Sequence, residues 1–249
     1  MRVHGTHAVV DRDGSPDAVA VEEPLEIRVG SEPVAVTMRT PGQDEELAVG
    51  FLYGEGLVDG PAEAGPPADL AANTIEVRGA VRAPAARRFY TTSSCGVCGK
   101  GALDEVRVHV APLGDGPIVA RALLAALPGG LRQPGFERTG GMHATGLFTD
   151  AGELLCVRED VGRHNAMDKV VGRALLDGAL PLAGRLLCVS GRLSFELVQK
   201  AAVAGAPVLV GVGAPTSLAF ALAEEVGLTL AGFARGDRVN VYAGAQRVA

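Results

Sequence analysis

The sequence predicts an α/β protein with a smaller, strand-rich region in its amino-terminal part. Helical and strand-like patterns alternate from about residue 113 to the end of the chain, which is typical of a sheet covered by helices. The segments before residue 112 are mainly short and alternate apolar with polar residues. The 249 residues suffice for one large or two modest domains. We therefore predict two domains, 1–112 and 113–249.

Composition and charge narrow the class of protein. With 47% hydrophobic and 21% charged residues, the composition is that of a globular protein. The formal net charge of -6 argues against a general nucleic-acid binder. We find neither a signal-peptide pattern nor an apolar run long enough to span a membrane. These features predict a cytoplasmic protein whose cysteines are reduced.

The region before residue 112 begins with a predicted hairpin. Leu25–Val29 and Val34–Met38 both alternate, and Gly30–Pro33 forms the turn between them. Asp44 opens a helical run, since acidic residues favour the first turn of a helix. The other expectations for this region are loose structure over 1–21, a helix over Glu45–Tyr53, a loop over Asp59–Ala72, and strands over Thr74–Arg78 and Val106–Val110.

After residue 113, strands and helices follow one another in a pattern that implies parallel pairing of the strands. In the helix that starts at Ser194, Glu196 and Lys200 are predicted to pair on the outward face. The predicted elements are a helix over Ile118–Leu127, hairpin strands over Ala144–Thr149 and Glu153–Arg158, helices over His164–Leu176, Ser194–Val203 and Thr216–Val226, and strands over Arg185–Ser190, Pro207–Val212, Leu228–Phe233 and Arg238–Tyr242.

Two of the four cysteines, Cys95 and Cys98, lie in a glycine-rich stretch. Gly96 and Gly99 leave both sulfurs accessible, and Lys100 adds positive charge, so the surroundings favour the nucleophilic thiolate. Three interpretations compete: half of a zinc site, a thioredoxin-like dithiol, and a sulfur carrier that holds a persulfide. The chain has no second pair of ligands for a closed zinc site and no long helix pattern after the cysteines, so the sulfur carrier is favoured.

The other cysteines and three polar segments complete the set of candidates. Cys156 and Cys188 fall in apolar strand-like runs and are predicted to be buried core thiols. His143 follows two glycines, which leave room beside an imidazole. The segment Glu159–Lys169, which contains Arg163, has more charge than a helix cap requires; the alternative is a solvated face with a His164/Asp168 pair.

The segment Gly232–Arg238 suits a nucleotide. Arg235 and Arg238 can bind phosphate, and Phe233 can stack on a base. The alternative is an ordinary polar turn between two strands.

Together these segments resemble the formate dehydrogenase accessory sulfurtransferase (FdhD) family. The resemblance covers nearly the whole chain after about Pro24. The segments that carry it, in the family's order, are Ser93–Lys100, Gly141–Ala144, Glu159–Lys169, Ser190–Arg192, Ala214–Ser217 and Gly232–Arg238.

The resemblance implies a sulfurtransferase that is a cytoplasmic homodimer with a cytidine-deaminase-like α/β domain. It implies that sulfur passes from a cysteine desulfurase to the molybdenum or tungsten of a bis(molybdopterin guanine dinucleotide) cofactor, and that formate dehydrogenase needs this sulfur. Cys95 matches the family's persulfide-forming cysteine and Cys98 its second cysteine. The residues that match the family's cofactor-binding loop are Phe233, Ala234, Arg235, Gly236, Asp237 and Arg238.

We add His143 and Arg163 as candidate cofactor contacts, and we predict no structural metal and no membrane partner. Deaminase activity is not expected, because Thr145 stands where the zinc deaminases need a glutamate. Two other functions stay open: a cofactor chaperone that moves no sulfur, and a thiol–disulfide oxidoreductase.

Overall fold

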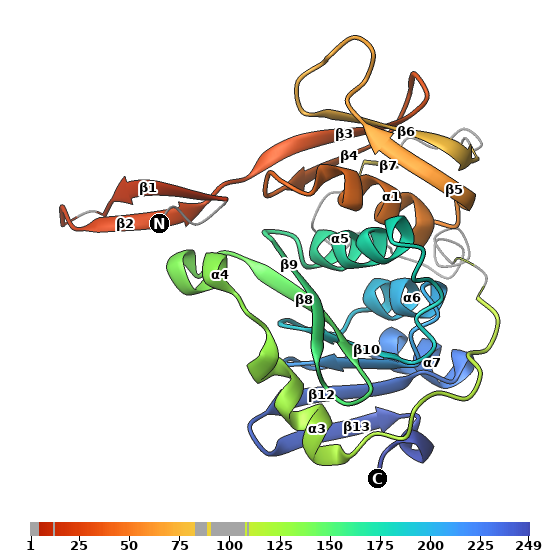
Figure 1. The fold of residues 1–249 in the computed structure, drawn as a ribbon. Helices are drawn as coiled ribbons and strands as arrows, with labels where there is room; N and C mark the ends of the chain where they lie inside the picture. The colour runs from red at the N-terminus through yellow and green to blue at the C-terminus, as the bar shows by residue number, and fades with distance from the viewer. Residues whose placement is uncertain (1–4, 12, 83–88, 91–107, 109) are drawn as a thin grey trace.

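The computed structural model describes residues 5–11, 13–82, 89–90, 108 and 110–249. Two large sheets lie at opposite ends of the molecule, with helices stacked between them, and a two-stranded arm projects from one side (Figure 1). The α/β class and the smaller strand-rich amino-terminal part are therefore confirmed. The likeness to cytidine deaminases and the boundary at residue 112 stay predictions.

The amino-terminal part is a five-stranded sheet covered on its inner face by helix α1 (Asp44–Gly54). Leu25 and Ile27 of the sheet are buried against Leu47 and Leu52 of α1, as the alternation of the first strand predicts. The strands in spatial order are β5 (Val58–Gly65), β6 (Thr74–Val81), β3 (Glu23–Val29), β4 (Glu32–Arg39) and β7 (Phe89–Tyr90).

The larger part is a six-stranded mixed sheet. Its strands in spatial order are β13 (Arg238–Ala243), β12 (Thr229–Arg235), β11 (Val208–Gly211), β10 (Arg185–Val189), β8 (His143–Thr149) and β9 (Leu154–Asp160). Strands β10, β11 and β12 pair in parallel, as predicted from the alternation of strands and helices. The hairpin of β8 and β9 is also confirmed.

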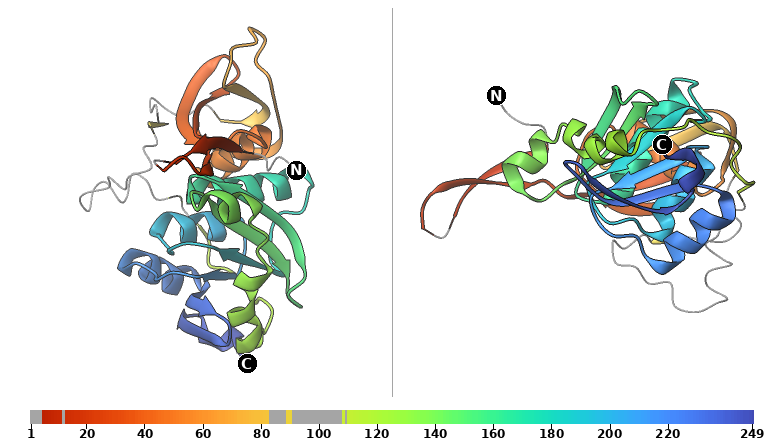
Figure 2. Two further views of the ribbon diagram at one scale, coloured as in Figure 1. Left: turned by 90° about the vertical axis from the view of Figure 1, so that its left-hand side faces the viewer. Right: turned by 90° about the horizontal axis from the view of Figure 1, so that it is seen from below.

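Helices cover both faces of this sheet. Leu187 and Val189 point to the face that carries α5 (Arg163–Leu176), α6 (Phe195–Val203) and α7 (Ser217–Val226). Leu186 and Cys188, which alternate with them, point to the face that carries α3 (Arg121–Ala126) and a 3₁₀ turn (Leu127–Gly130). Figure 2 shows the same layers from two other directions, with α1 lying on α5 between the two sheets.

Two expectations for the amino-terminal elements are wrong. Residues 1–21 are not loose throughout, because β1 (Thr6–Val10) and β2 (Pro16–Ala20) form a hairpin around Asp11, whose Oδ1 accepts the N–H groups of Asp13 and Ser15. The predicted loop over Asp59–Ala72 contains β5, an edge strand with a bulge that tolerates its glycine and proline.

A short helix, α4 (Pro134–Thr139), was not predicted. Its first N–H groups, from Gly135 and Phe136, donate to the carboxylate of Glu159 at 2.9 and 2.8 Å. The capping residue Glu159 is distant in the sequence, so no local pattern predicts this helix. Helix α3 starts at Arg121 rather than Ile118, because Val119 bridges to Val248 instead.

The outward Glu196/Lys200 pair is a further error. Lys200 is only 2% exposed, and its Nζ lies 2.8 Å from Asp168 Oδ1 and 5.5 Å from the centre of the Phe51 ring. Helix α1 covers this face of α6, so the lysine is buried beneath it. The alternative His164/Asp168 pair is also wrong, because Asp168 pairs with Lys200.

Among the described residues, no helix is both long and apolar enough to cross a membrane. The strand predicted over Val106–Val110 falls mainly outside the described residues.

Candidate functional site

The strand directions bring several predicted site residues to one edge of the six-stranded sheet. Strands β10, β11 and β12 end at this edge because they are parallel. Strand β8 runs the other way, so its first residue, His143, lies at the same edge and pairs with Asp160 at the end of β9. We call this the carboxyl edge; open α/β sheets bind ligands at such edges.

Glycines hold the loops of the carboxyl edge close together. The N–H of Gly213, after β11, donates to the carbonyl of Gly191, after β10, at 2.9 Å. The N–H of Phe233 in β12 donates to the carbonyl of Gly213 at 3.2 Å. A Cβ on Gly213 would lie 3.0 Å from the backbone of Arg192, and one on Gly191 would lie 3.4 Å from His143 Nδ1. The loops therefore approach one another too closely at Gly213 for a side chain to fit there without a shift.

Positive charge gathers beside His143. Burial lowers the pKa of His143, and the nearby guanidinium groups of Arg163 and Arg192 lower it further, while Asp160 acts in the opposite direction. Arg163 begins helix α5, and its Nε is buried without a hydrogen-bond partner among the described residues. A buried donor without a partner is costly, so an acceptor from a bound anion would satisfy it. His143 and Arg163, both predicted, are thus brought together.

The hairpin Phe233–Arg238 overhangs the same edge. Because Val210 pairs with Ala231, the last residues of β12 extend beyond the end of β11. The pairing with β13 is irregular between Gly232 and Arg235, and Phe233 has a left-handed φ of 53°. Irregularities of this kind redirect side chains, and Phe233 is 49% exposed. Arg235 and Arg238 pair directly across the hairpin, and both are exposed.

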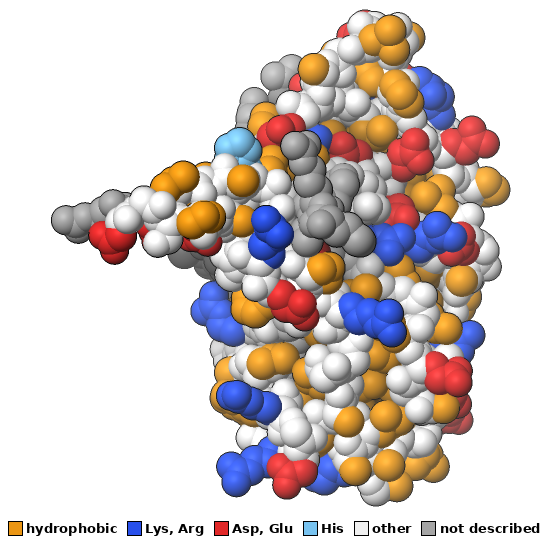
Figure 3. Space-filling view, turned by 60° about the vertical axis from the view of Figure 1, so that its left-hand side comes forward, with side chains coloured by type: hydrophobic (Ala, Val, Ile, Leu, Met, Phe, Trp, Pro, Cys, Tyr) orange, Lys and Arg blue, Asp and Glu red, His pale blue; other side chains and the backbone are white. Residues whose placement is uncertain are grey.

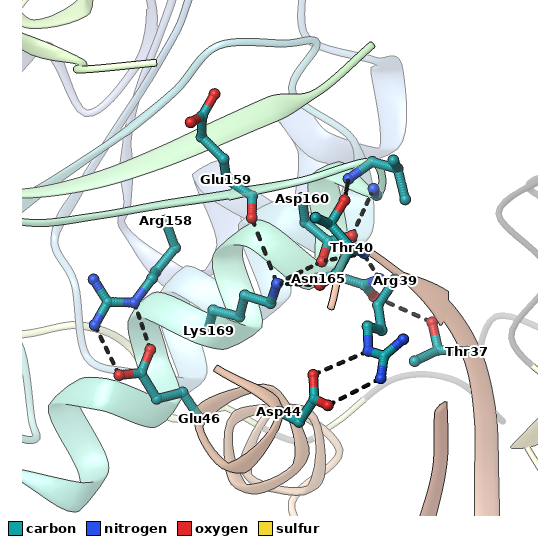
Figure 4. Close-up of polar contacts among 12 residues, drawn as sticks. Thr37, Arg39, Thr40, Asp44, Glu46, Arg158, Glu159, Asp160, Asn165 and Lys169 are labelled. Atoms are coloured by element: carbon teal, nitrogen blue, oxygen red, sulfur yellow. Dashed lines mark hydrogen bonds and ion pairs between the residues drawn. The ribbon is translucent and has the colours of Figure 1, made fainter. Parts of the chain in front are cut away.

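The start of α5 is fixed by a buried ion pair. Lys169 Nζ lies 2.7 Å from Asp160 Oδ2, and both side chains are fully buried. Lys169 also donates to the carbonyl of Thr40 at 3.0 Å, and the N–H of Thr40 donates to Asp160, which joins the two parts of the molecule (Figure 4). The N–H of Gly162 donates to Asp160 Oδ1 at 2.8 Å. The segment Glu159–Lys169 is therefore no solvated face; it positions Arg163.

Similarity to known proteins identifies the family of this chain. The sequence model of the FdhD/NarQ family matches residues 20–249. The chain belongs to the FdhD/NarQ family. The sulfur carrier protein FdhD of Streptomyces coelicolor is 53% identical over 262 residues, covering 96% of this chain and 93% of that protein. The protein of the same name from Mycobacterium tuberculosis is 50% identical and covers 94% and 92%.

The fold has a counterpart among solved structures of the family. The crystal structure of a putative formate dehydrogenase accessory protein from Desulfotalea psychrophila superposes with a TM-score of 0.76 at 27% identity and covers 99% of both chains. The resemblance on which the sequence analysis rested is therefore confirmed.

As in the resemblance to this family, Cys95 and Cys98 are the candidate sulfur residues, and both lie outside the described residues. The chain enters that segment from β7, which pairs with β4 at Ala35 and Val36. After it, the N–H of Val108 donates to Gln199 Oε1 of α6 at 3.0 Å.

The two described cysteines are poor sulfur carriers. Cys188 is fully buried, as predicted, and burial raises its pKa far above the ordinary range of a thiol. Cys156, also predicted to be a buried core thiol, is only partly buried, although burial still raises its pKa.

One residue of the site, Arg192, was not among the predicted site residues. It is exposed and lies close enough to His143 to lower its pKa. The signal in the sequence is its place in the loop that follows the buried strand β10, just after Gly191, because loops at the end of such a strand lie at the carboxyl edge.

Proposed function

We propose that this chain is a sulfur carrier that serves a formate dehydrogenase. The observation that carries the proposal is the carboxyl edge, where Arg163 and Arg192 lie near His143 and the exposed Phe233 belongs to the hairpin at the same edge. Such an edge suits a ligand with both phosphate and a planar base. Membership of the FdhD/NarQ family, whose relatives carry the name sulfur carrier protein, supports the same function.

We assign the acceptance of sulfur from the donor to Cys95. Its thiolate attacks the outer sulfur of a persulfide on a cysteine desulfurase. A new sulfur–sulfur bond forms to Cys95 while the bond to the donor's cysteine breaks, and that cysteine leaves as a thiolate. No net oxidation or reduction occurs, so no further reagent is needed. The complete burial of Cys188, which keeps its thiol away from a donor protein, supports placing this step in the Cys95–Cys98 stretch.

The acceptor is the molybdenum or tungsten centre of bis(molybdopterin guanine dinucleotide), a substrate that the protein binds and releases. We assign its diphosphate to Arg235 and Arg238, with His143 and Arg163 as further contacts at the same edge. Phe233 would lie against guanine or ribose, and Asp237 would accept hydrogen bonds from the donor edge of guanine. Ala234 and Gly236 complete the hairpin. We also propose that the protein works in the cytoplasm as a homodimer and that Cys98 supports Cys95.

Trapping a persulfide separates this function from its rivals. Purified protein is incubated with a cysteine desulfurase and cysteine, and its mass is measured with and without reductant. The proposal expects about one reducible sulfur per chain on Cys95, lost in Cys95→Ala and kept in the control Cys156→Ala. A chaperone would bind guanine nucleotide but gain no sulfur, and a thiol–disulfide oxidoreductase would form a Cys95–Cys98 disulfide instead.

A further inference from the structure

Residues 91–107, which we call the cysteine segment, lie between two parts of the chain that the structure describes. Before the segment, β7 ends at Tyr90, which pairs with Val36 of β4. After it, the chain is described again at Val108. Because the segment carries Cys95, the attachment of its two ends limits where sulfur on Cys95 can be delivered.

The entry to the cysteine segment is attached to the start of α5. From Val36, the partner of Tyr90, β4 continues for two residues to Met38. The carbonyl of Met38 accepts a hydrogen bond from the side-chain amide of Asn165 at 2.7 Å, and Asn165 is 8% exposed. Asn165 lies two residues after Arg163, so the entry is attached to the helical turn that carries a residue of the carboxyl edge.

The exit from the cysteine segment is attached to α6. The N–H of Val108 donates to Oε1 of Gln199 at 3.0 Å, and Gln199 is 3% exposed. Gln199 follows Ser194, the N-cap of α6, by five residues, which is about 8 Å along the helix axis. Helix α6 begins at the carboxyl edge, just after Arg192. Val108 also contacts the end of α1, where a Cβ on Gly56 would lie 3.1 Å from Val108 Cγ1.

The lengths of chain allow Cys95 to reach the carboxyl edge of its own molecule. Cys95 follows Tyr90 by five residues and precedes Val108 by thirteen. Such lengths span at most about 18 Å and about 45 Å. The two residues of β4 between the entry and Met38 span only about 7 Å, so both attachments lie near the helix starts that form the edge. A group tethered within reach of its site acts at an effective concentration of about a millimolar, which favours it over a separate molecule.

The charge at the carboxyl edge suits an incoming persulfide. The edge lies on the side of the molecule from which the arm of β1 and β2 projects, because His143 closely follows α4, and α4 packs on the arm. Figure 3 shows exposed Lys and Arg side chains on this side. A persulfide anion and an anionic acceptor both favour positive surroundings.

We propose that each chain delivers sulfur in cis, from its own Cys95 to an acceptor at its own carboxyl edge, with Gln199 as a positioning residue. This inference rests on the proposed sulfur-carrier function. In the delivery step the outer sulfur of the persulfide bonds to the metal of the acceptor, the sulfur–sulfur bond breaks, and Cys95 leaves as a thiolate. The reduced metal supplies the two electrons that convert the outer sulfur to sulfide. Gln199 touches neither reactant; it holds the exit of the cysteine segment beside the edge.

Two variants expressed together distinguish delivery in cis from delivery between chains. The first is Cys95→Ala, which carries no sulfur. The second combines Arg163→Met, Arg235→Ala and Arg238→Ala, which remove contacts to the acceptor. Formate dehydrogenase activity is measured in cells that lack their own copy of the gene, and co-expression of the wild type with each variant is the control. Delivery in cis predicts no activity from either variant or from the mixture.

Delivery between the chains of a dimer predicts a different result for the mixture. Half of the dimers would be mixed, and each would hold one competent pair of cysteine and edge, so roughly a quarter of the wild-type activity would return. That recovery would overturn the proposal. Activity of the arginine variant by itself would also overturn it, because sulfur would then be delivered somewhere other than the carboxyl edge.

The role of Gln199 is tested by removing its hydrogen bond from either end. Gln199→Met removes the acceptor, and Val108→Pro removes the N–H donor. Each should lower delivery about fivefold, while the sulfur loaded on Cys95, measured by mass, stays at the wild-type level. The double variant should deliver as well as either single variant, because both changes remove the same bond. Gln246→Met, at an exposed site, is the matched control.

Losses that multiply in the double variant, or full delivery by both single variants, would overturn the positioning role of Gln199. Loading of Cys95 also separates this inference from the proposed function. If the wild-type protein gains no sulfur from the desulfurase, both fail. If Cys95 is loaded and the mixture of variants is active, only delivery in cis fails.

Discussion

Gly50 of α1 and Gly172 of α5 meet where the two helices cross. A Cβ on Gly50 would overlap the carbonyl of Asp168, and a Cβ on Gly172 would overlap the carbonyl of Glu46. The two helices come from different parts of the chain and lie between the two sheets, so this contact sets how closely the two parts approach.

The close crossing predicts that a glycine-to-alanine change in a helix lowers the stability of this protein instead of raising it. In an exposed helix, Gly→Ala stabilises by about 1 kcal/mol. At Gly172 the added methyl must push two backbones apart, so Gly172→Ala should lower the free energy of unfolding by about 1–3 kcal/mol. Urea unfolding measures the effect. Gly184→Ala is the control, because a Cβ there meets nothing within 4 Å. Stabilisation by Gly172→Ala would contradict the close crossing.

A second prediction concerns the buried pair of Asp160 and Lys169. Lys169→Met leaves the carboxylate of Asp160 buried without its counter-charge, which typically costs about 3–5 kcal/mol. The exposed pair of Arg173 and Asp177 is the control, since Arg173→Ala should cost less than about 0.5 kcal/mol. Equal effects of the two changes on urea unfolding would show that the buried pair does not join the two parts.

Local patterns predicted most of the six-stranded sheet. Its strands and helices alternate along the chain, and each buried strand is recognisable from its own run of apolar residues. Because a buried strand, Leu228–Ala231, precedes it, the Phe233–Arg238 hairpin was predictable at a carboxyl end of the sheet. The place of His143 at the same edge was not predicted, because it depends on the antiparallel direction of β8. The hairpin's irregularity at Phe233 was not predictable, since a left-handed φ at a phenylalanine has no signature in sequence.

Two of the errors share one physical cause, which is contact between distant segments. Glu159 caps α4, and α1 buries Lys200, yet neither partner is near in sequence. The arm was missed because its alternation lacks a buried partner along most of its length. Cys95 and Cys98 were found from glycine spacing and family resemblance, and their roles stay predictions.

A third prediction concerns acid stability. His164 Nε2 lies 3.1 Å from Ser194 Oγ, and burial chiefly lowers the pKa of His164 to about 4. The unfolded chain therefore takes up this proton at a higher pH than the folded protein does, so the stabilisation is complete above about pH 6.5 and is lost as the pH falls toward 4. The loss by pH 4 should be about 3 kcal/mol, because each unit of pKa shift corresponds to about 1.4 kcal/mol. In His164→Gln, urea midpoints should change less over this range, whereas His7→Gln, at an exposed site, should behave like the wild type.

The last prediction tests nucleotide binding at the carboxyl edge, with guanosine diphosphate as a surrogate for one end of the cofactor. Arg235→Ala and Arg238→Ala should each weaken binding about ten- to a hundredfold in calorimetry, because each removes a charge-assisted contact. Arg185→Ala is the matched control, since Arg185 is exposed at the start of β10, on the opposite edge of the sheet. Sulfur uptake by Cys95 should survive all three changes, because accepting sulfur does not need the cofactor. If both hairpin variants bind with wild-type affinity, the hairpin is only a turn between strands. The anion site would then be the buried Arg163 Nε beside His143, and Arg163→Met should abolish the remaining affinity.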